Sequence, residues 1–516
     1  MLKLDLGTVI SSVEGPSPTN FSFVVKENGT SVKRGQFVEL DTAEGLLIGR
    51  VSDVRKANRY FEREESVREY EKKGSSMESI FPVDKWEFTV GVVKPLGVYV
   101  EGKKMMLKPS FPPSPGSKVR LASDDFLKQF LGIDNEGLYL GSIEHHDVDV
   151  KLNLTNLLQK HFAILAMSGA GKSYLTSVVI EELLDRNKEQ GRVGIVMIDV
   201  HGEYTNFAEP VKAGSDKKDY SKLCKVLNGS NIKIGVPNLS GGQICRLIGG
   251  LSSVQTRDLK NKIRQIQKKF RKGGGTYNLI DIVKEVERSD KMKSSTKDAL
   301  KNWIFSLNAT GVFSDVDYPS VKTIVKPGKM SIIDLSSIIS NKKKQIITSY
   351  IVNELFKMRR NGDIPPFLLI VEEAHQFVPE GVSSDYALAR SIIETIAREG
   401  RKFHASLCLI SQRPKRLSTT VLSQCNTHVI MRITNPYDLD HIKASSEGIT
   451  SDTLDAISSL PVGEGLIVGE AVNYPVFVKI RERNSQSSAK SKGLEDAAIE
   501  FESKNDKKNE DAESFM

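Results

Sequence analysis

The hydrophobic positions divide the chain into two regions with different patterns. Up to about residue 58, short runs such as GTVISSV, FSFVVK and QFVELDT are separated by turn residues such as EGPSPTN and ENGT. Closely spaced strands broken by Gly, Pro and Asn predict a small barrel or sandwich. The charged run at residues 60–76 predicts a helix or a solvated linker. Strand-like runs resume at WEFTVGVVKPLGVYV, and this domain is predicted to end near residue 150.

Beyond residue 150 the apolar runs become uniform. FAILAM, VGIVMIDV, MSIIDL, FLLIVEE, SLCLIS and HVIMRI are apolar almost throughout, and helical stretches separate them. Strands buried on both faces, with helices between them, predict a parallel α/β sheet. Residues 240–310 interrupt this pattern with helical, Lys/Arg-rich sequence and predict a helical insertion. Residues 484–516 are rich in Ser, Lys and acids and predict a disordered tail.

The pattern therefore predicts five segments. They are a β-barrel domain (1–150), the first part of an α/β core (151–239), a helical insertion (240–310), the second part of the core with closing strands (311–483) and a tail (484–516).

Composition narrows the class of protein. A chain of 516 residues is too long for one ordinary core. The net charge is +8, and the last 33 residues carry five basic and eight acidic side chains, so the rest is more basic still. This balance is compatible with nucleic acid. No run approaches ~20 apolar residues, no secretory signal is evident, and four scattered cysteines favour neither disulfides nor zinc. We expect a cytoplasmic protein without a membrane span.

The candidate chemistry begins with AMSGAGKS at residues 166–173, which joins an apolar strand to an amphipathic helix. Backbone N–H groups at such a helix start wrap phosphates, and the helix dipole favours the anion. Lys172 is predicted to reach the outer phosphates and the Ser173 hydroxyl to bind Mg²⁺. The predicted ATP-binding residues are Ser168, Gly169, Ala170, Gly171, Lys172, Ser173 and Tyr174. Ala166 replaces the more common glycine, and it is tolerated if its φ is negative.

Acidic residues at strand ends are candidates for the metal and the attacking water. Asp199 ends VGIVMIDV, and Glu203 follows it; Glu372 and Glu373 end FLLIVEE. Two adjacent carboxylates suit hydrolysis, because one can help to hold the coordination shell of the metal while the other orients the attacking water. We favour Glu372 for the metal and Glu373 for water, with Asp199 as a second metal candidate or a loop cap.

Two arginines and a glutamine further along the chain are candidates for completing the hydrolytic site. The helix YALARSIIETIAREGRKF buries one face and is predicted to stop at Gly400, which places Arg398 in its last turn and Arg401 just beyond. Arginines at the C-terminal end of a helix often do no more than interact with the helix dipole or with solvent. In a ring ATPase they can instead reach a neighbouring subunit's site. Gln412 is predicted at a strand tip as a sensor of the terminal phosphate, or as a turn-stabilising amide.

Taken in order, AMSGAGKS, IDVHGEY, LLIVEEAH, AREGRKF and ISQRP resemble the HerA family of hexameric DNA translocases, which are related to FtsK. The resemblance covers residues 1–483 and includes the barrel strands. It implies a RecA-like P-loop core, a homohexamer that hydrolyses ATP between subunits, duplex DNA in the channel, and DNA-end resection with a NurA-type nuclease docked on the barrel side. Lys160 stands where the family often has arginine, which puts any interface role of that residue in doubt.

Weaker signals have plainer interpretations. His145, His146 and Asp147 lack further ligands at suitable spacing, which favours a polar loop over a metal site. Residues 257–272 carry eight basic side chains and one acidic one, which predicts a solvated face or, alternatively, DNA-backbone contact. Lys342, Lys343 and Lys344 are further candidates for lining a channel.

Two other functions remain open from the sequence. A ring ATPase of this kind can power a different load, as a DNA-transfer motor or the engine of a defence complex. A nucleotide-dependent switch or scaffold is the non-enzymatic alternative, and the Glu372–Glu373 pair argues against it, because a binding-only module needs no water-orienting carboxylate.

Overall fold

The structure, a computed structural model, describes residues 4–11, 15–26, 31–58, 68, 87–100, 105–273, 275–290, 292–383, 386–446, 448–487, 494–496, 498–499 and 501–503. The chain forms two compact units. Unit 1 is Met1–Lys151 with Val472–Lys479, and unit 2 is Leu152–Ala471 with Ile480–Met516. The segment at residues 60–76, predicted as a helix or linker, lies outside the described residues apart from Arg68.

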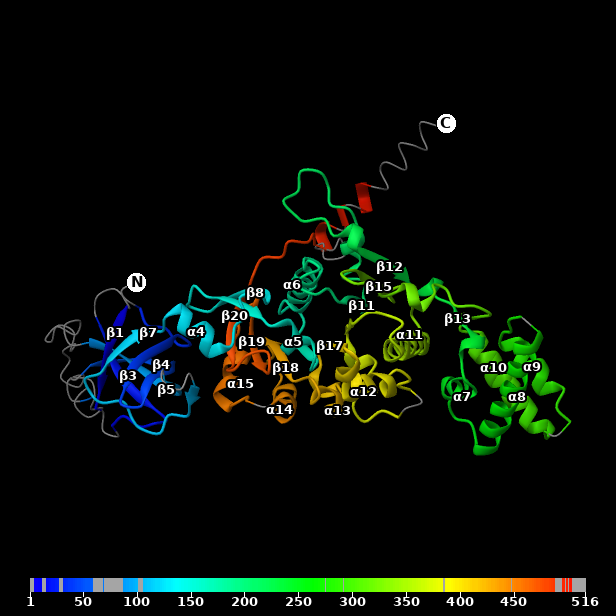
Figure 1. The fold of residues 1–516 in the computed structure, drawn as a ribbon, viewed down its shortest axis with the longest axis horizontal. Coiled ribbons are helices and arrows are strands. Elements are labelled where there is room, and N and C mark those ends of the chain that lie inside the picture. Colours follow the sequence, from blue (N-terminus) through cyan, green and yellow to red (C-terminus); the bar gives the residue numbers. More distant parts are fainter. Residues whose placement is uncertain are drawn as a thin grey trace. The chain divides into compact units, whose positions relative to one another are not determined.

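Unit 1 contains a closed antiparallel β-barrel, as predicted (Figure 1). The described strands pair in the order β2-β1-β7-β3-β4-β5, and β2 pairs with β5 to close the ring. The strands are β1 (Asp5–Ile10), β2 (Phe21–Val25), β3 (Phe37–Thr42), β4 (Gly45–Asn58), β5 (Glu87–Val100) and β7 (Lys118–Leu121), and β6 (Met105–Leu107) pairs with β5. Closure leaves none of the six ring strands with an open edge.

The barrel core follows from alternation along its strands. In β2, Phe21, Phe23 and Val25 are buried and the residues between them are half-buried. Gly91 on β5 faces Phe23, and a β-carbon there would lie 2.4 Å from the Phe23 ring. Glycine at this position therefore leaves the room that the buried ring occupies.

The rest of unit 1 consists of α4 (Asp124–Leu131) and the strands β8 (Leu138–Ile143), β9 (Asp149–Leu152) and β20 (Val476–Ile480), in the order β20-β8-β9. The segment 472–479 was predicted to close the α/β core, and the structure instead places it in unit 1. Its backbone explains the difference: Asn473 donates to the carbonyl of Leu131 at 2.9 Å, and β20 lies beside β8.

Unit 2 is built on a largely parallel sheet, which confirms the predicted α/β core. Its strand order is β12-β15-β11-β16-β17-β10-β18-β19, and only the pairing of β19 with β18 among these is antiparallel. The strands are β10 (Phe162–Leu165), β11 (Gly194–Asp199), β12 (Cys224–Asn228), β15 (Met330–Asp334), β16 (Phe367–Val371), β17 (Ala405–Ser411), β18 (Thr427–Met431) and β19 (Glu464–Gly469). Every residue of β10, β11, β16, β17 and β18 is buried, as strands covered on both faces require.

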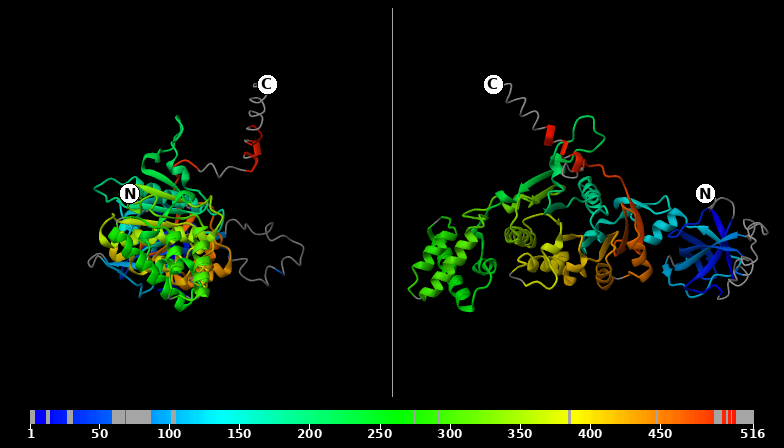
Figure 2. Two further views of the ribbon diagram at one scale, coloured as in Figure 1. Left: turned by 90° about the vertical axis from the view of Figure 1, so that its right-hand side faces the viewer. Right: turned by 180° about the vertical axis from the view of Figure 1, so that it is seen from behind.

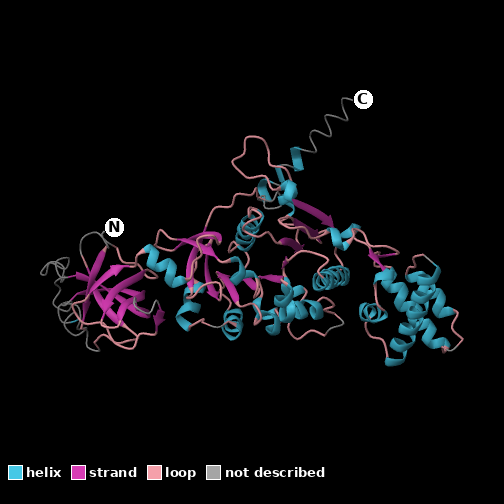
Figure 3. Cartoon of the chain, viewed as in Figure 1, coloured by secondary structure: helices cyan, strands magenta, loops and turns pink. Residues whose placement is uncertain are grey.

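Helices cover both faces of this sheet (Figure 3). The chain runs from β10 to β11 through α6 in one direction across the sheet, and from β15 to β16 and on to β17 through α11 and α12 in the other. Right-handed crossovers therefore place α6 on the face opposite α11 and α12. The helices are α5 (Leu154–Leu158), α6 (Lys172–Leu184), α11 (Asn341–Asn361), α12 (Arg390–Glu399), α13 (Thr419–Leu422), α14 (Pro436–Ser445) and α15 (Ser451–Ser458).

The helices α7 (Gly241–Ile248), α8 (Ser253–Gly273), α9 (Leu279–Glu287) and α10 (Ser294–Asn308) form a cluster within the residues predicted as an insertion. Both views of Figure 2 show them packed beside one another. Leu259, Ile263 and Ile266 give α8 its buried stripe, while Lys268 and Lys269 are exposed. The short strands β13 (Ile234–Gly235) and β14 (Phe313–Ser314) pair where the chain enters and leaves the cluster.

Candidate nucleotide-binding and hydrolytic site

The loop at residues 166–171 joins the central strand β10 to α6. Gly169 and Gly171 have φ angles of 78° and 104°, which other residues rarely adopt, and Gly171 caps the N-terminus of α6. Ala166 is fully buried and is not among the described residues with positive φ, so alanine there carries no backbone strain. The loop thus has the backbone that a phosphate cradle at a helix N-terminus needs.

A pocket of about 450 Å³ opens at this loop. Of the residues predicted to act here, it is lined by Ser168, Gly169, Gly171, Lys172, Ser173, Tyr174, Glu373 and Gln412, while Ala170 is buried beneath it. His201 and Glu203 also line the pocket. The loop and the carboxyl ends of β11, β16 and β17 therefore meet at one edge of the sheet, where open α/β sheets bind ligands.

Glu373 and Lys172 form an ion pair inside the pocket. Nζ of Lys172 lies 2.9 Å from Oε1 of Glu373, and the two side chains are 10% and 3% exposed. Glu373 has φ 47° and ψ 46°, a left-handed conformation that is strained for a glutamate and is held only by its surroundings. Its Oε2 is buried and makes no hydrogen bond among the described residues, although the His375 ring lies close to it. That oxygen is an acceptor available to a water molecule.

Sequence reasoning missed His375 and Ser411, which surround the same carboxylate. Nδ1 of His375 lies 3.2 Å from Oε2 of Glu373 and 3.2 Å from Oγ of Ser411. Burial lowers the pKa of His375, the Glu373 charge opposes this shift, and Arg413 and Arg416 add to it. His375 lies in the one-turn helix η8 (Ala374–Gln376), directly after Glu373, and contacts the carboxylate oxygen that Lys172 does not.

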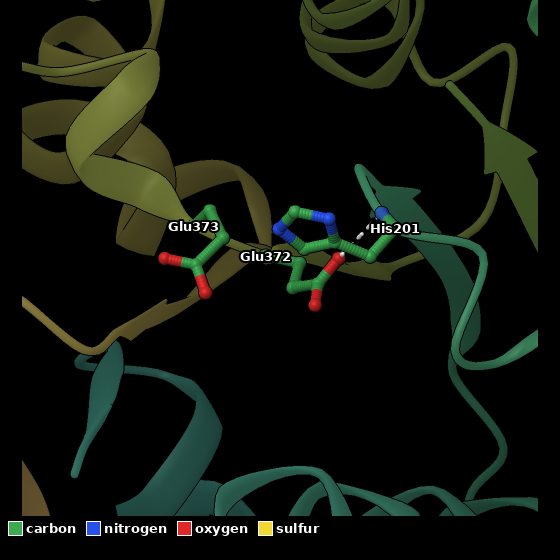
Figure 4. A group of neighbouring side chains, drawn as sticks. All are labelled: His201, Glu372 and Glu373. Atoms are coloured by element: carbon green, nitrogen blue, oxygen red, sulfur yellow. Dashed lines mark hydrogen bonds between the residues drawn. The ribbon is translucent and has the colours of Figure 1, made fainter. Parts of the chain in front are cut away.

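Glu372 and Asp199 form a second, fully buried carboxyl pair. Oε2 of Glu372 accepts a hydrogen bond from the backbone of Val200 at 2.8 Å. It also accepts one from the backbone of His201 at 3.3 Å (Figure 4). Burial raises the pKa of both groups, that of Glu372 well above its usual range with the Asp199 charge adding to the effect. The negative charge of each carboxyl therefore disfavours ionisation of the other, and Oε1 of Glu372 is buried without a hydrogen-bond partner among the described residues.

Asp199 is positioned as a loop cap. Its two oxygens accept from the backbone N–H groups of Gly202, Glu203 and Tyr204 at 2.6 to 3.1 Å. Asp199 and Glu372 do not line the pocket, which differs from the predicted metal set. Glu203 does line the pocket, and the Ser173 hydroxyl donates to its carboxylate. The motif IDVHGEY already held this signal: Asp199 folds the loop, and the loop presents Glu203.

These donors fit a divalent cation. The side chains of His201, Glu372 and Glu373 each offer one atom within 4.8 Å of the others, and Figure 4 shows Glu372 and Glu373 turned to different sides. Hydroxyl and carboxylate oxygens are the ligands that Mg²⁺ prefers, which favours Ser173 with Glu203 over the His201 ring.

The predicted arginines lie away from this pocket. Arg398, in the last turn of α12, is 59% exposed and contacts Glu394 at 4.0 Å, and Arg401 is exposed in η9 (Gly400–Phe403). Gly400 ends α12 as predicted, but with φ −56° rather than a left-handed angle. It is needed for space, because a β-carbon there would lie 2.4 Å from the Ala405 carbonyl oxygen. Lys160 pairs with Glu470 in the same unit.

The start of the predicted disordered tail is packed against α6. Glu181, fully buried on α6, accepts from Arg481, Asn484 and Ser485 at 2.6 to 3.0 Å. The backbone N–H of Arg483 donates to the Tyr174 hydroxyl at 2.8 Å. Residues 481–486, which we name the strap, therefore fix α6 and one wall of the pocket. The disorder predicted from Asn484 onward is wrong for Asn484, Ser485 and Gln486, because a buried carboxylate binds this polar segment.

The other weak signals resolve locally. His146 accepts a hydrogen bond from the backbone of Phe37 at 2.9 Å, and burial lowers its pKa to about 4. This supports the polar-loop interpretation of residues 145–147. No helix among the described residues is long and apolar enough to cross a bilayer.

A family model and several curated relatives that match this chain are described as HerA helicases. Residues 138–355 match the family described as "Helicase HerA, central domain". The DNA double-strand break repair helicase HerA of Pyrococcus furiosus is 29% identical, with 93% of this chain and 94% of the relative aligned. The protein of that name from Saccharolobus solfataricus is 28% identical over 92% of each chain. The structure of VirB4 of Thermoanaerobacter pseudethanolicus has a TM-score of 0.53 at 15% identity, covering 67% of this chain and 97% of that one, which is a likeness of fold alone.

Proposed function

We propose that the chain, which is similar to HerA helicases over nearly its whole length, is an ATP-driven translocase of double-stranded DNA that acts in DNA-end resection and recombinational repair. The observation that carries the proposal is the convergence of Lys172 and Glu373 at 2.9 Å in the loop pocket. Nucleotide hydrolases need a lysine that binds phosphate and a nearby carboxylate with an oxygen able to accept from water, and this pair has both features.

The residues divide the work as follows. Backbone N–H groups of residues 168–174 and Nζ of Lys172 hold the phosphates of ATP, and Tyr174 forms a wall of the pocket. Glu373 orients the attacking water through Oε2, and Gln412 contacts the terminal phosphate. Ser173 and Glu203 hold Mg²⁺, which neutralises phosphate charge when bound. Glu372 and Asp199 support this arrangement from below by fixing the loop at residues 200–204.

The assembly proposed is a homohexamer. Arg398 and, less directly, Arg401 are exposed and lie outside their own pocket, so a site completed in trans gives them a role. The proposed partners are duplex DNA, contacted without sequence preference, and a NurA-type nuclease. The proposed location is the cytoplasm, and the four free cysteines, three of them buried, suit its reducing conditions.

Steady-state ATP hydrolysis, with and without linear duplex DNA, tests the proposal. We expect duplex to stimulate hydrolysis by wild type, and we expect Glu373→Gln to abolish hydrolysis both alone and, when mixed with wild type, in the mixed rings. Robust hydrolysis that is indifferent to DNA would mean that the motor moves a different load. Strict additivity on mixing would show that the sites are not shared.

A further inference from the structure

A second cavity, of about 890 Å³, lies beside the nucleotide pocket in unit 2. It is formed by the connections that follow β15, β16, β17 and β18, four parallel strands whose carboxyl ends lie at the same edge of the sheet. We name it the basic groove. Its walls include Lys344, His375, Tyr386, Lys415, Arg416 and Tyr437.

The groove is positively charged. Within the described part of the chain, no carboxylate comes within 4 Å of the side-chain nitrogens of Lys344, Lys415 or Arg416. Glu380 also lines the groove, but its carboxylate is engaged by the backbone N–H and hydroxyl of Thr419 at 2.6 and 3.2 Å. Three cations therefore face one acid that is already hydrogen-bonded.

Two tyrosine rings stand exposed among these cations. Tyr386 is 81% and Tyr437 64% exposed, and Nζ of Lys415 lies 4.1 Å from the centre of the Tyr437 ring. Large aromatic rings without a cover, placed beside unpaired cations, suit a ligand with both anionic groups and flat or sugar surfaces. A nucleic-acid strand with its phosphates has this chemistry.

Resting on the proposed function, we propose that the basic groove binds the phosphate backbone of the DNA that the motor moves, and that His375 is a positioning residue that links the filled groove to Glu373. Contacts to phosphate read no sequence, which suits a motor that tracks any duplex.

The link is short. Nδ1 of His375 contacts both Oε2 of Glu373 and Oγ of Ser411, and the same residue lines the groove. The carbonyl of its neighbour Gln376 accepts from the buried side chain of Gln345, a further groove residue, at 2.6 Å. Because Glu373 holds a strained left-handed backbone, a small movement of the turn Ala374–Gln376 changes where its carboxylate points.

The first test compares two double charge reversals, Lys415→Glu with Arg416→Glu in the groove and Lys268→Glu with Lys269→Glu on the exposed face of α8. The measurement is duplex affinity against salt concentration, with a non-hydrolysable ATP analogue bound. We expect the groove pair to weaken binding at least tenfold and to lower the salt slope by about 2, roughly 0.9 for each phosphate that the protein no longer neutralises. The α8 pair carries the same charge change and should weaken binding less than about threefold.

The second test isolates His375. We expect His375→Ala to bind duplex within about twofold of wild type but to lose most of the stimulation of hydrolysis by DNA. His375→Asn, whose amide can occupy the place of Nδ1, should restore part of it. A stimulation ratio unchanged in His375→Ala, with hydrolysis lowered equally in the presence and absence of DNA, would overturn the positioning role.

The outcomes separate this inference from the function it rests on. Wild-type affinity in the groove pair, or an equal loss in the α8 pair, overturns the groove while leaving the DNA motor intact. If wild-type protein neither binds duplex nor responds to it, the proposed function itself fails. Unchanged binding of the ATP analogue by every variant shows that the fold is retained.

Discussion

Lys172 and Glu373 are 201 positions apart in the sequence, yet their charged groups lie 2.9 Å apart at the floor of the nucleotide pocket. In this arrangement the Glu373 carboxylate pairs with the Lys172 ammonium group, which the outer phosphates of ATP would need under the proposed function. Under that function, nucleotide must displace Glu373 from Lys172 before both residues can act, so the ion pair competes with ATP.

Replacing Glu373 by Gln separates these two effects. We expect ATP to bind several-fold more tightly, because Lys172 is no longer paired, while kcat falls about a hundredfold or more with the loss of the water-orienting carboxylate. Nucleotide titration and single-turnover hydrolysis measure the two quantities. Glu372→Gln is the matched control, because the Glu372 carboxyl accepts from the backbone of Val200 and His201 and does not line the pocket, and it should cost far less in kcat. Equal losses in the two variants would contradict the assignment of roles.

Arg398→Ala should lower kcat roughly a hundredfold or more if it completes a neighbouring site, with little change in ATP affinity. Arg401→Ala should have a smaller effect. Lys402→Ala removes an adjacent exposed cation and serves as the control. The decisive measurement is hydrolysis by mixtures of Arg398→Ala with Lys172→Ala, whose separate defects complement only across a shared site. No recovery in such mixtures would argue against a trans arginine.

The strap predicts unequal effects of two truncations. Deleting residues 488–516 should leave the free energy of unfolding nearly unchanged. Deleting residues 484–516 removes the Asn484 and Ser485 donors from the buried Glu181 carboxylate and should cost about 3 kcal/mol. Urea unfolding of both proteins checks this. Arg481 remains in the longer deletion and still pairs with Glu181 at 2.9 Å, so the loss comes from the Asn484 and Ser485 donors alone. Equal stability of the two truncated proteins would show that the strap contributes nothing.

Buried histidines predict a loss of stability in mild acid. Burial lowers the pKa of His161 and of His428 to about 4, so the folded state keeps both neutral while the unfolded chain takes up protons below its usual pKa near 6.5. Stability therefore falls as pH drops through 6.5, by about 2 kcal/mol per histidine between pH 7 and pH 5. Urea unfolding at the two pH values measures it.

The matched variants are His161→Gln and His404→Asn. The first should reduce the pH-dependent loss by about 2 kcal/mol, since its amide oxygen can still accept from the Leu407 backbone in place of Nδ1. The second changes an exposed histidine whose left-handed backbone suits asparagine, and the loss should stay as in wild type. An identical pH dependence in wild type and His161→Gln would rule out His161 as a source.

The parts of the site that were predictable are those set by local chain order. Strand, glycine loop and helix follow one another without a gap, so the positions of Lys172 and Ser173 follow from the motif. Uniform apolar runs mark strands covered on both faces, and the acids that end them must lie at one edge of a parallel sheet. For this reason the sequence alone predicts Glu373 at the pocket.

The contacts that escaped prediction depend on which strands are neighbours. His375 meets Ser411 because β16 pairs with β17, and no spacing along the chain states that pairing. Asp199 and Glu203 were hard to rank because loop folding decides which carboxylate faces Ser173. The polar composition of the strap predicts disorder, and only the buried Glu181 on α6 explains why this segment is ordered.

Unit 1 contains residues from two distant places, because the chain returns at Val472–Lys479 after completing most of unit 2. The barrel unit is therefore not a detachable leader. A shortened protein that begins at residue 152 would keep β20 but lose β8, its partner in the sheet, and would carry an uncovered strand edge with nothing to pair with except another molecule.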